Sequence, residues 1–219
     1  MRYPNALSGI RKIYTAEMLT LLAAVLGVAA SVFGGIISQQ IAGGGEITAQ
    51  SAVSVLIPVL AAGLITIIAG IMQLFGLKDA SADDESFRKG YTYALMGLVF
   101  SVAFTVLSNT KTGGSLLDDG AKLLSNIIEI AVTFFVIAGI KSLAEKLGDM
   151  NMVSRGKTVF NIYAASVICS SLAQLASAVL QNDLKTVVSG ILGIITLVLT
   201  AVAYILYLGY LGRAKKMLA

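Results

Sequence analysis

Long apolar segments follow one another along this chain, separated by short polar stretches. Six such segments, each of roughly 20 residues, lie at 17–39, 52–76, 91–109, 123–143, 158–181 and 186–211. An α-helix of about 20 residues is long enough to cross the roughly 30 Å hydrocarbon core of a bilayer. The pattern therefore predicts an all-α integral membrane protein with six transmembrane helices.

The composition agrees with this interpretation. The chain is 57% hydrophobic and only 13% charged, with a mean hydropathy of +0.86, whereas a soluble domain carries about 25% charged residues. Few residues remain outside the six segments, so we expect one membrane domain over residues 1–219 and no separate soluble domain. Any binding must then take place within the helix bundle or on short loops.

Internal similarity divides the chain into three parts. RKIYTA at 11–16 matches RKGYTYA at 88–94, and IAGIMQL at 68–74 matches IAGIKSL at 137–143. A similar spacing, of 70 residues, relates Gly139 to Gly209. We therefore predict three tandem two-helix hairpins, at about 8–78, 79–147 and 148–219.

This arrangement resembles the HdeD-like short-repeat membrane proteins. The similarity lies in the three hairpins and in the residues GI..L at 70–74 and 139–143, near the end of the second helix of a pair. It implies a shared architecture. It implies no activity, substrate or site residue.

The basic residues predict the direction in which the helices cross. Thirteen of the 16 Lys and Arg residues lie at the end of the hairpins that carries both termini, and only Lys111, Lys122 and Lys185 lie at the other end. Basic loops are retained on the cytoplasmic side, so we expect cytoplasmic N- and C-termini in a cell membrane such as a bacterial inner membrane. Tyrosines at the same end are expected to form an interfacial aromatic belt: Tyr14, Tyr91, Tyr163, Tyr207 and Tyr210.

The residues needed for common enzyme chemistry are missing. The chain has no histidine and a single cysteine, Cys169, so an internal disulfide and the usual Cys/His zinc sites are excluded. No nucleotide-binding motif and no activated nucleophile appear. We expect no enzymatic activity, cofactor, metal or nucleic-acid partner. Asp83, Asp84 and Glu85 precede the third segment and are expected to cap its helix.

Small and polar residues recur at helical spacing in the odd-numbered segments. The fifth segment carries Ser166, Ser170, Gln174, Ser177 and Gln181, the third carries Ser101, Thr105 and Ser108, and the first carries Ala23, Gly27, Ser31 and Gly35. Polar groups within hydrocarbon need partners, so these faces are expected to point into protein or a water-filled cavity. Two interpretations stay open. The faces allow close helix packing, or they line a polar pathway.

Glu129 lies inside the fourth apolar segment, seven residues from Lys122 and roughly 10 Å below that end of the helix. Its repeat equivalents are Leu60 and Leu199, so the charge breaks the three-fold pattern. By the same measure Gln174 lies at a similar depth. Ser101 and Thr105 bracket it. An intramembrane carboxylate is a functional-site hypothesis; the alternative is a hydrogen-bonded glutamate that holds two helices in register.

These features favour two functions. The first is a small transporter or channel for a cation, a proton or a small polar solute, with Glu129, Gln174, Ser101, Thr105, Ser170 and Ser177 as ligand-binding residues. The second is a non-catalytic membrane subunit or envelope stress-response component that acts through helix contacts, for which Ala23, Gly27, Ser31 and Gly35 form the packing face. Both place the chain against lipid and against a second copy or another membrane protein.

Overall fold

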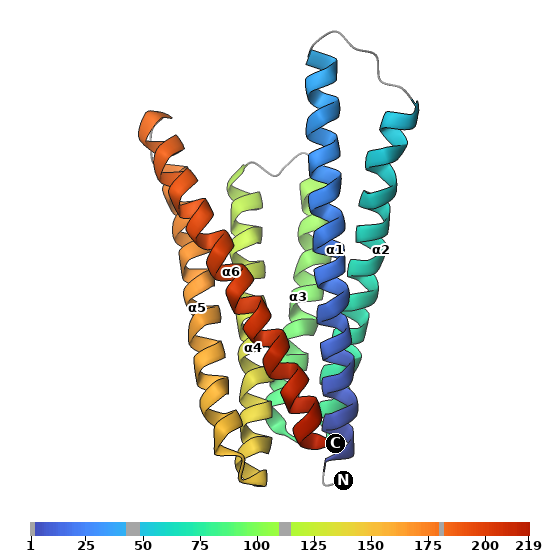
Figure 1. The fold of residues 1–219 in the computed structure, drawn as a ribbon, viewed down its shortest axis with the longest axis vertical. Coiled ribbons are helices and arrows are strands. Elements are labelled where there is room, and N and C mark those ends of the chain that lie inside the picture. Colours follow the sequence, from blue (N-terminus) through green and yellow to red (C-terminus); the bar gives the residue numbers. More distant parts are fainter. Residues whose placement is uncertain (1–2, 43–48, 110–114, 180–181) are drawn as a thin grey trace. The chain divides into compact units, whose positions relative to one another are not determined.

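The computed structural model describes residues 3–42, 49–109, 115–179 and 182–219, and these residues form six α-helices (Figure 1). The helices are α1 (Pro4–Ala42), α2 (Ala49–Ala80), α3 (Glu85–Asn109), α4 (Ser115–Leu147), α5 (Met150–Val179) and α6 (Asn182–Leu218). The all-helical prediction is therefore confirmed. Each helix begins before its apolar segment, in the polar sequence that precedes it.

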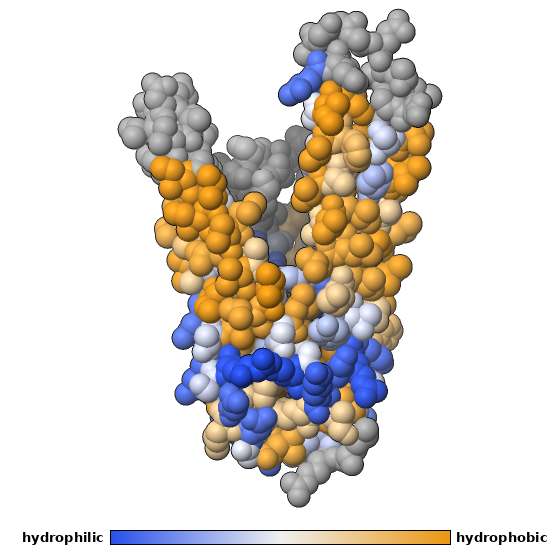
Figure 2. All heavy atoms as spheres, viewed as in Figure 1, coloured by the Kyte–Doolittle hydropathy of each residue, from blue (hydrophilic) through white to orange (hydrophobic). Residues whose placement is uncertain are grey.

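Four helices are long and apolar enough to span a membrane over the residues whose side chains are described. These stretches are Pro4–Gln39, Val53–Ala80, Leu124–Leu147 and Ile191–Leu218. Three of these stretches bury few residues of their apolar part, whereas the apolar part of the α4 stretch is 44% buried. On α6, Ile194, Leu197 and Ile205 are 69%, 71% and 68% exposed, and Figure 2 shows apolar residues along the middle part of this helix. Each such side chain left in water forgoes about 1.5–3 kcal/mol of burial, so these helices support membrane embedding.

The chain divides into two compact units. The first, here called the α3–α6 unit, contains residues 1–10 and 77–219. The second, the α1–α2 unit, contains residues 11–76. Within the α1–α2 unit the Gln73 side-chain amide donates to Glu17 Oε1 at 3.4 Å and joins its two helices. Within the α3–α6 unit, α3 packs along α4, α4 along α5 and α5 along α6.

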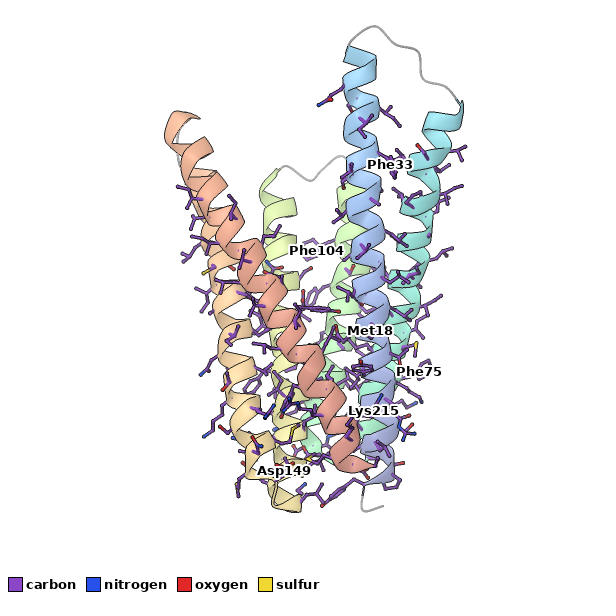
Figure 3. The ribbon with its side chains drawn as sticks, viewed as in Figure 1. Met18, Phe33, Phe75, Phe104, Asp149 and Lys215 are labelled. Atoms are coloured by element: carbon purple, nitrogen blue, oxygen red, sulfur yellow. The ribbon has the colours of Figure 1, made fainter. Side chains whose placement is uncertain are left out.

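A tight turn joins α4 to α5. Gly148 adopts a φ of 77°, a left-handed conformation in which glycine has no Cβ to clash. The Asp149 amide donates to the Ala144 carbonyl at 2.9 Å and the Gly148 amide to the Glu145 carbonyl at 3.1 Å, which is a Schellman ending. The Asp149 carboxylate then accepts from the Met152 amide at 3.1 Å and caps α5. Figure 3 shows Asp149 at this turn.

The acidic turn between α2 and α3 forms two separate caps. Asp84 accepts from the Ser86 amide at 3.0 Å, so its predicted capping of α3 is confirmed. The prediction for Asp83 is wrong: its carboxylate accepts from the Ala6 amide at 2.6 Å and from the Asn5 side chain at 3.2 Å. Asp83 therefore satisfies the exposed amides at the start of α1, which the chain order alone does not indicate.

Asp84 also ties this turn to α4. Its Oδ2 accepts from the Ser142 hydroxyl at 2.7 Å and from Lys146 Nζ at 2.9 Å, and its side chain is only 7% exposed. Burial acts to raise the pKa of Asp84, but the hydrogen bonds from Ser142, Lys146 and Ser86 outweigh it and hold that pKa below its ordinary value. The ionised form is thus the one that the fold stabilises.

The core of the α3–α6 unit gathers at the end that contains these two turns. Phe87, Val136, Ile140, Leu143 and Leu211 are completely buried there. Aromatic pairs connect neighbouring helices across it: Tyr93 with Phe135 at 5.3 Å, Phe134 with Phe160 at 5.1 Å, and Tyr163 with Tyr207 at 6.3 Å between ring centroids. Such pairs add about 0.5–1.5 kcal/mol each to the burial of the rings.

This core corrects the predicted tyrosine belt. Tyr163, Tyr207 and Tyr210 are 8%, 2% and 2% exposed, so they pack inside the bundle and do not face a lipid–water boundary. Their position near the polar end of each helix looks interfacial in the sequence. The helix faces on which they lie turn them inward.

Candidate functional site

A pocket opens among α4, α5 and α6 next to the core of the α3–α6 unit. Its volume is about 170 Å³. Asn126 and Glu129 line it from α4, Tyr163, Ser166, Val167 and Ser170 from α5, and Thr200 and Tyr204 from α6. Glu129 supplies the one carboxylate among these residues. The lining is otherwise composed of one amide, three aliphatic hydroxyls, two phenols and a valine.

Glu129 is held by a tyrosine from the neighbouring helix. The Tyr163 hydroxyl donates to Glu129 Oε1 at 2.8 Å. Tyr163 itself has little freedom, because its side chain is buried and its ring lies against Tyr207 of α6. One phenol thus links three helices and orients the carboxylate. The Glu129 side chain is exposed, so it stands at the open side of the pocket.

The remaining polar residues reach the pocket through helical spacing. Asn126 precedes Glu129 by nearly one turn of α4, and Ser166 and Ser170 lie one turn apart on α5. The Ser166 hydroxyl donates to the Tyr163 carbonyl at 2.7 Å. Its oxygen lone pairs remain available to accept from a ligand.

Helix α6 contributes a polar stripe that the sequence reasoning missed. Thr196, Thr200 and Tyr204 recur every fourth residue and so share one face. Thr200 and Tyr204 line the pocket. The hydroxyl of Thr196 is buried and has no hydrogen-bond partner within the described part of the chain. The four-residue spacing of Thr196, Thr200 and Tyr204 was the sequence signal for the α6 side of the pocket. On α4 the corresponding signal was Asn126, nearly one helical turn before Glu129.

The structure groups some of the predicted ligand-binding residues and separates others. Glu129 and Ser170 line the same pocket. Ser101 lies on α3, where it is exposed, and it is not among the residues of this pocket. The side chains of Thr105, Gln174 and Ser177 lie outside the described residues. The binding roles of all six stay predictions.

The register of α4 against α5 differs from the one expected. Glu129 pairs with Tyr163, which precedes Gln174 by about 16 Å of helix axis. The tight turn explains the difference: Glu129 lies 18 residues before the end of α4, and the residue 18 positions after the start of α5 is Ile168. Counting residues from this turn places Glu129 between Tyr163 and Ser170. Counting instead from the opposite ends of the two apolar segments in the sequence places Glu129 beside Gln174.

The predicted packing face of α1 is only partly covered. Ala23 is 7% exposed, Gly27 is half-buried, and Ser31 and Gly35 are exposed. A Cβ added at Gly27 or Gly35 would meet no atom within 4 Å. The Ser31 hydroxyl donates to the Gly27 carbonyl at 2.9 Å, so the helix itself satisfies this polar group. The role of the face in helix association stays a prediction.

The pocket combines one carboxylate with neutral polar groups. A carboxylate accepts hydrogen bonds when ionised, and hydroxyl and amide oxygens add further acceptors. Among the described residues no group of three His, Cys, Asp or Glu side chains is placed to share a metal ion. The arrangement suits a proton or a ligand that donates hydrogen bonds.

Comparison with protein-family models, curated proteins and solved structures found no match to this chain. The resemblance to the HdeD-like proteins therefore stays an expectation from the hairpin pattern.

Proposed function

We propose that this protein is a six-span membrane transporter or channel that moves a cation, a proton or a small polar solute through the α4–α6 pocket. Glu129 is the residue that binds the moving species. The observation that carries the proposal is a carboxylate on an apolar helix, hydrogen-bonded by Tyr163 and facing a polar pocket. In this proposal α3 and α5 also cross the membrane, with both termini in the cytoplasm.

Glu129 carries an energetic cost within the membrane. An acidic side chain near the centre of a membrane helix costs about 2.5–3.5 kcal/mol on insertion scales. Helix packing alone does not require it, because the equivalent positions of the other two predicted hairpins hold leucine. A ligand-binding role accounts for a charge that the fold tolerates at this cost.

The surroundings of the pocket support a ligand that enters or leaves through one end of the pocket at a time. Toward the α4–α5 turn the bundle closes on buried apolar side chains, among them Val136, Ile140 and Leu211. Away from that turn the polar positions continue through Ser170 on α5 and Thr196 on α6. A site with one closed and one polar end fits a transporter in a state open to one side.

Infrared difference spectroscopy on the reconstituted protein tests this proposal. The carboxylate band of Glu129, identified by its loss in Glu129→Gln, is expected to shift when a cation is added at constant pH. Glu145→Gln is the matched control, since Glu145 also lies on α4, is exposed and pairs with Lys141 at 3.7 Å.

Flux into liposomes completes the test. A cation or proton flux that Glu129→Gln abolishes and Glu145→Gln retains would support transport. A Glu129 band that responds to no added cation would identify a fixed structural carboxyl, and the transport proposal would be wrong.

A second function is favoured by α1. Its small-residue face leaves room for another helix at Gly27 and Gly35, which suits a non-catalytic membrane subunit that acts by helix association. Cross-linking of Ser31→Cys in a Cys169→Ser background distinguishes this subunit role from transport. Specific dimers or a specific membrane partner would favour the subunit, particularly alongside a silent Glu129.

A further inference from the structure

We infer that the ligand of the α4–α6 pocket is a compact organic ammonium ion of about six to eight non-hydrogen atoms. The inference rests on the proposed function, because it names the class of cation that the Glu129 site takes. It follows from the charge, the size and the wall chemistry of the pocket.

The charge of the pocket suits a singly charged ligand. Glu129 is the one carboxylate among the lining residues, and no basic side chain lines the pocket. A divalent cation such as Ca²⁺ takes six to eight oxygen ligands and usually several carboxylates, which this lining does not supply. One carboxylate balances one ammonium charge.

The size of the pocket favours an organic ion over a bare inorganic one. A protein cavity of about 150 Å³ holds a benzene molecule, and this pocket has about 170 Å³. A desolvated K⁺ or Na⁺ would leave most of that volume empty and would touch few of the polar oxygens. A ligand with a small hydrocarbon body fills it.

The walls of the pocket match the two parts of such a ligand. Val167 and the rings of Tyr163 and Tyr204 offer apolar and aromatic surface to a hydrocarbon body, and aromatic faces also attract ammonium groups. Ser170, Thr200 and the Asn126 carbonyl offer acceptors for N–H donors.

The tyrosine contact positions the carboxylate for this role. Tyr163 donates to Oε1 of Glu129, which holds the carboxylate at the open side of the pocket and leaves Oε2 for an ammonium group. A charge-assisted N⁺–H···O⁻ bond is about twice as strong as a neutral one. Glu129 is therefore expected to discriminate a charged amine from a neutral molecule of the same shape.

Isothermal titration calorimetry on the full-length protein in detergent tests this inference with a matched pair of probes. Cyclohexylammonium and cyclohexanol share one ring and differ in charge. We expect cyclohexylammonium to bind and cyclohexanol to bind at least about tenfold more weakly. Glu129→Gln is expected to weaken cyclohexylammonium binding by a similar factor, and Glu145→Gln to leave it unchanged.

A second variant keeps the test decisive if Glu129→Gln does not fold. Val167→Phe narrows the pocket and leaves Glu129 in place. It is expected to abolish cyclohexylammonium binding and to retain methylammonium binding. Equal binding of cyclohexylammonium to the wild type and to Val167→Phe would place the ligand elsewhere and overturn the inference.

The outcomes separate this inference from the proposed function. If K⁺ binds as tightly as cyclohexylammonium and the Glu129 infrared band responds to K⁺, the site takes inorganic cations. The ammonium inference then fails and the transport proposal stands. If no cation binds and the band is silent, both fail.

Discussion

The close contact between Gly139 of α4 and Phe87 of α3 leads to the sharpest test of the packing argument. A Cβ added at Gly139 would lie 2.6, 2.7 and 2.8 Å from Cε2, Cζ and Cδ2 of the Phe87 ring. Carbon atoms pack favourably at about 3.5–4.0 Å, so the ring would have to move by about 1 Å. Phe87 is completely buried, and neighbouring side chains oppose that movement.

The magnitude follows from two opposing terms. Overpacking a buried site costs about 1–3 kcal/mol, while replacing a helical glycine by alanine returns about 1 kcal/mol of helix propensity. Gly209, the predicted repeat equivalent, has no atom within 4 Å of an added Cβ. Gly209→Ala therefore gains the propensity term alone. The free energy of unfolding of Gly139→Ala is expected to lie about 1–3 kcal/mol below that of Gly209→Ala.

Denaturant unfolding in detergent micelles, followed by far-ultraviolet circular dichroism, measures this difference. Phe87→Leu removes the two ring atoms nearest the added Cβ, Cε2 and Cζ, so in a double-mutant cycle Gly139→Ala should cost less in the Phe87→Leu background than in the wild type. Equal stability of Gly139→Ala and Gly209→Ala would refute the reasoning, because it would show that the Phe87 ring moves without penalty.

Two further substitutions test the turns of the α3–α6 unit. Asp84→Asn should lower stability by about 1–3 kcal/mol at neutral pH. Because the folded pKa of Asp84 lies below its ordinary value of 3.8, its contribution is present above the unfolded pKa and lost as pH falls through the folded one. The melting difference from wild type should therefore close below about pH 4, and a constant difference would contradict the ion-pair argument. Gly148→Ala should cost about 1–2 kcal/mol, since alanine is strained at a φ of 77°; Gly148→Asn should cost less, and an unchanged melting midpoint for Gly148→Ala would contradict the left-handed turn.

Several features of the fold were predictable because they depend on neighbouring residues in the chain. Apolar segments of sufficient length predicted helices, and Asp84 before α3 predicted a cap that its bond to the Ser86 amide confirms. Helix formation, capping and lipid affinity all depend on residues within one or two turns. Glu129 stood out for the same reason, as one charge within an apolar stretch.

Other features depend on which helix faces meet, and only the tertiary structure decided them. Asp83 caps α1 across 77 positions of sequence, and Tyr163 pairs with Glu129 across 34. The register that forms this pocket is set by the turn at Gly148 and by the packing of Tyr163 on Tyr207. The spacing of polar residues indicates which face of a helix is polar. A shift of one turn between two helices, however, changes the partner of every side chain on that face. The sequence thus determined the helices and the unusual charge, whereas side-chain packing between helices decided what that charge meets.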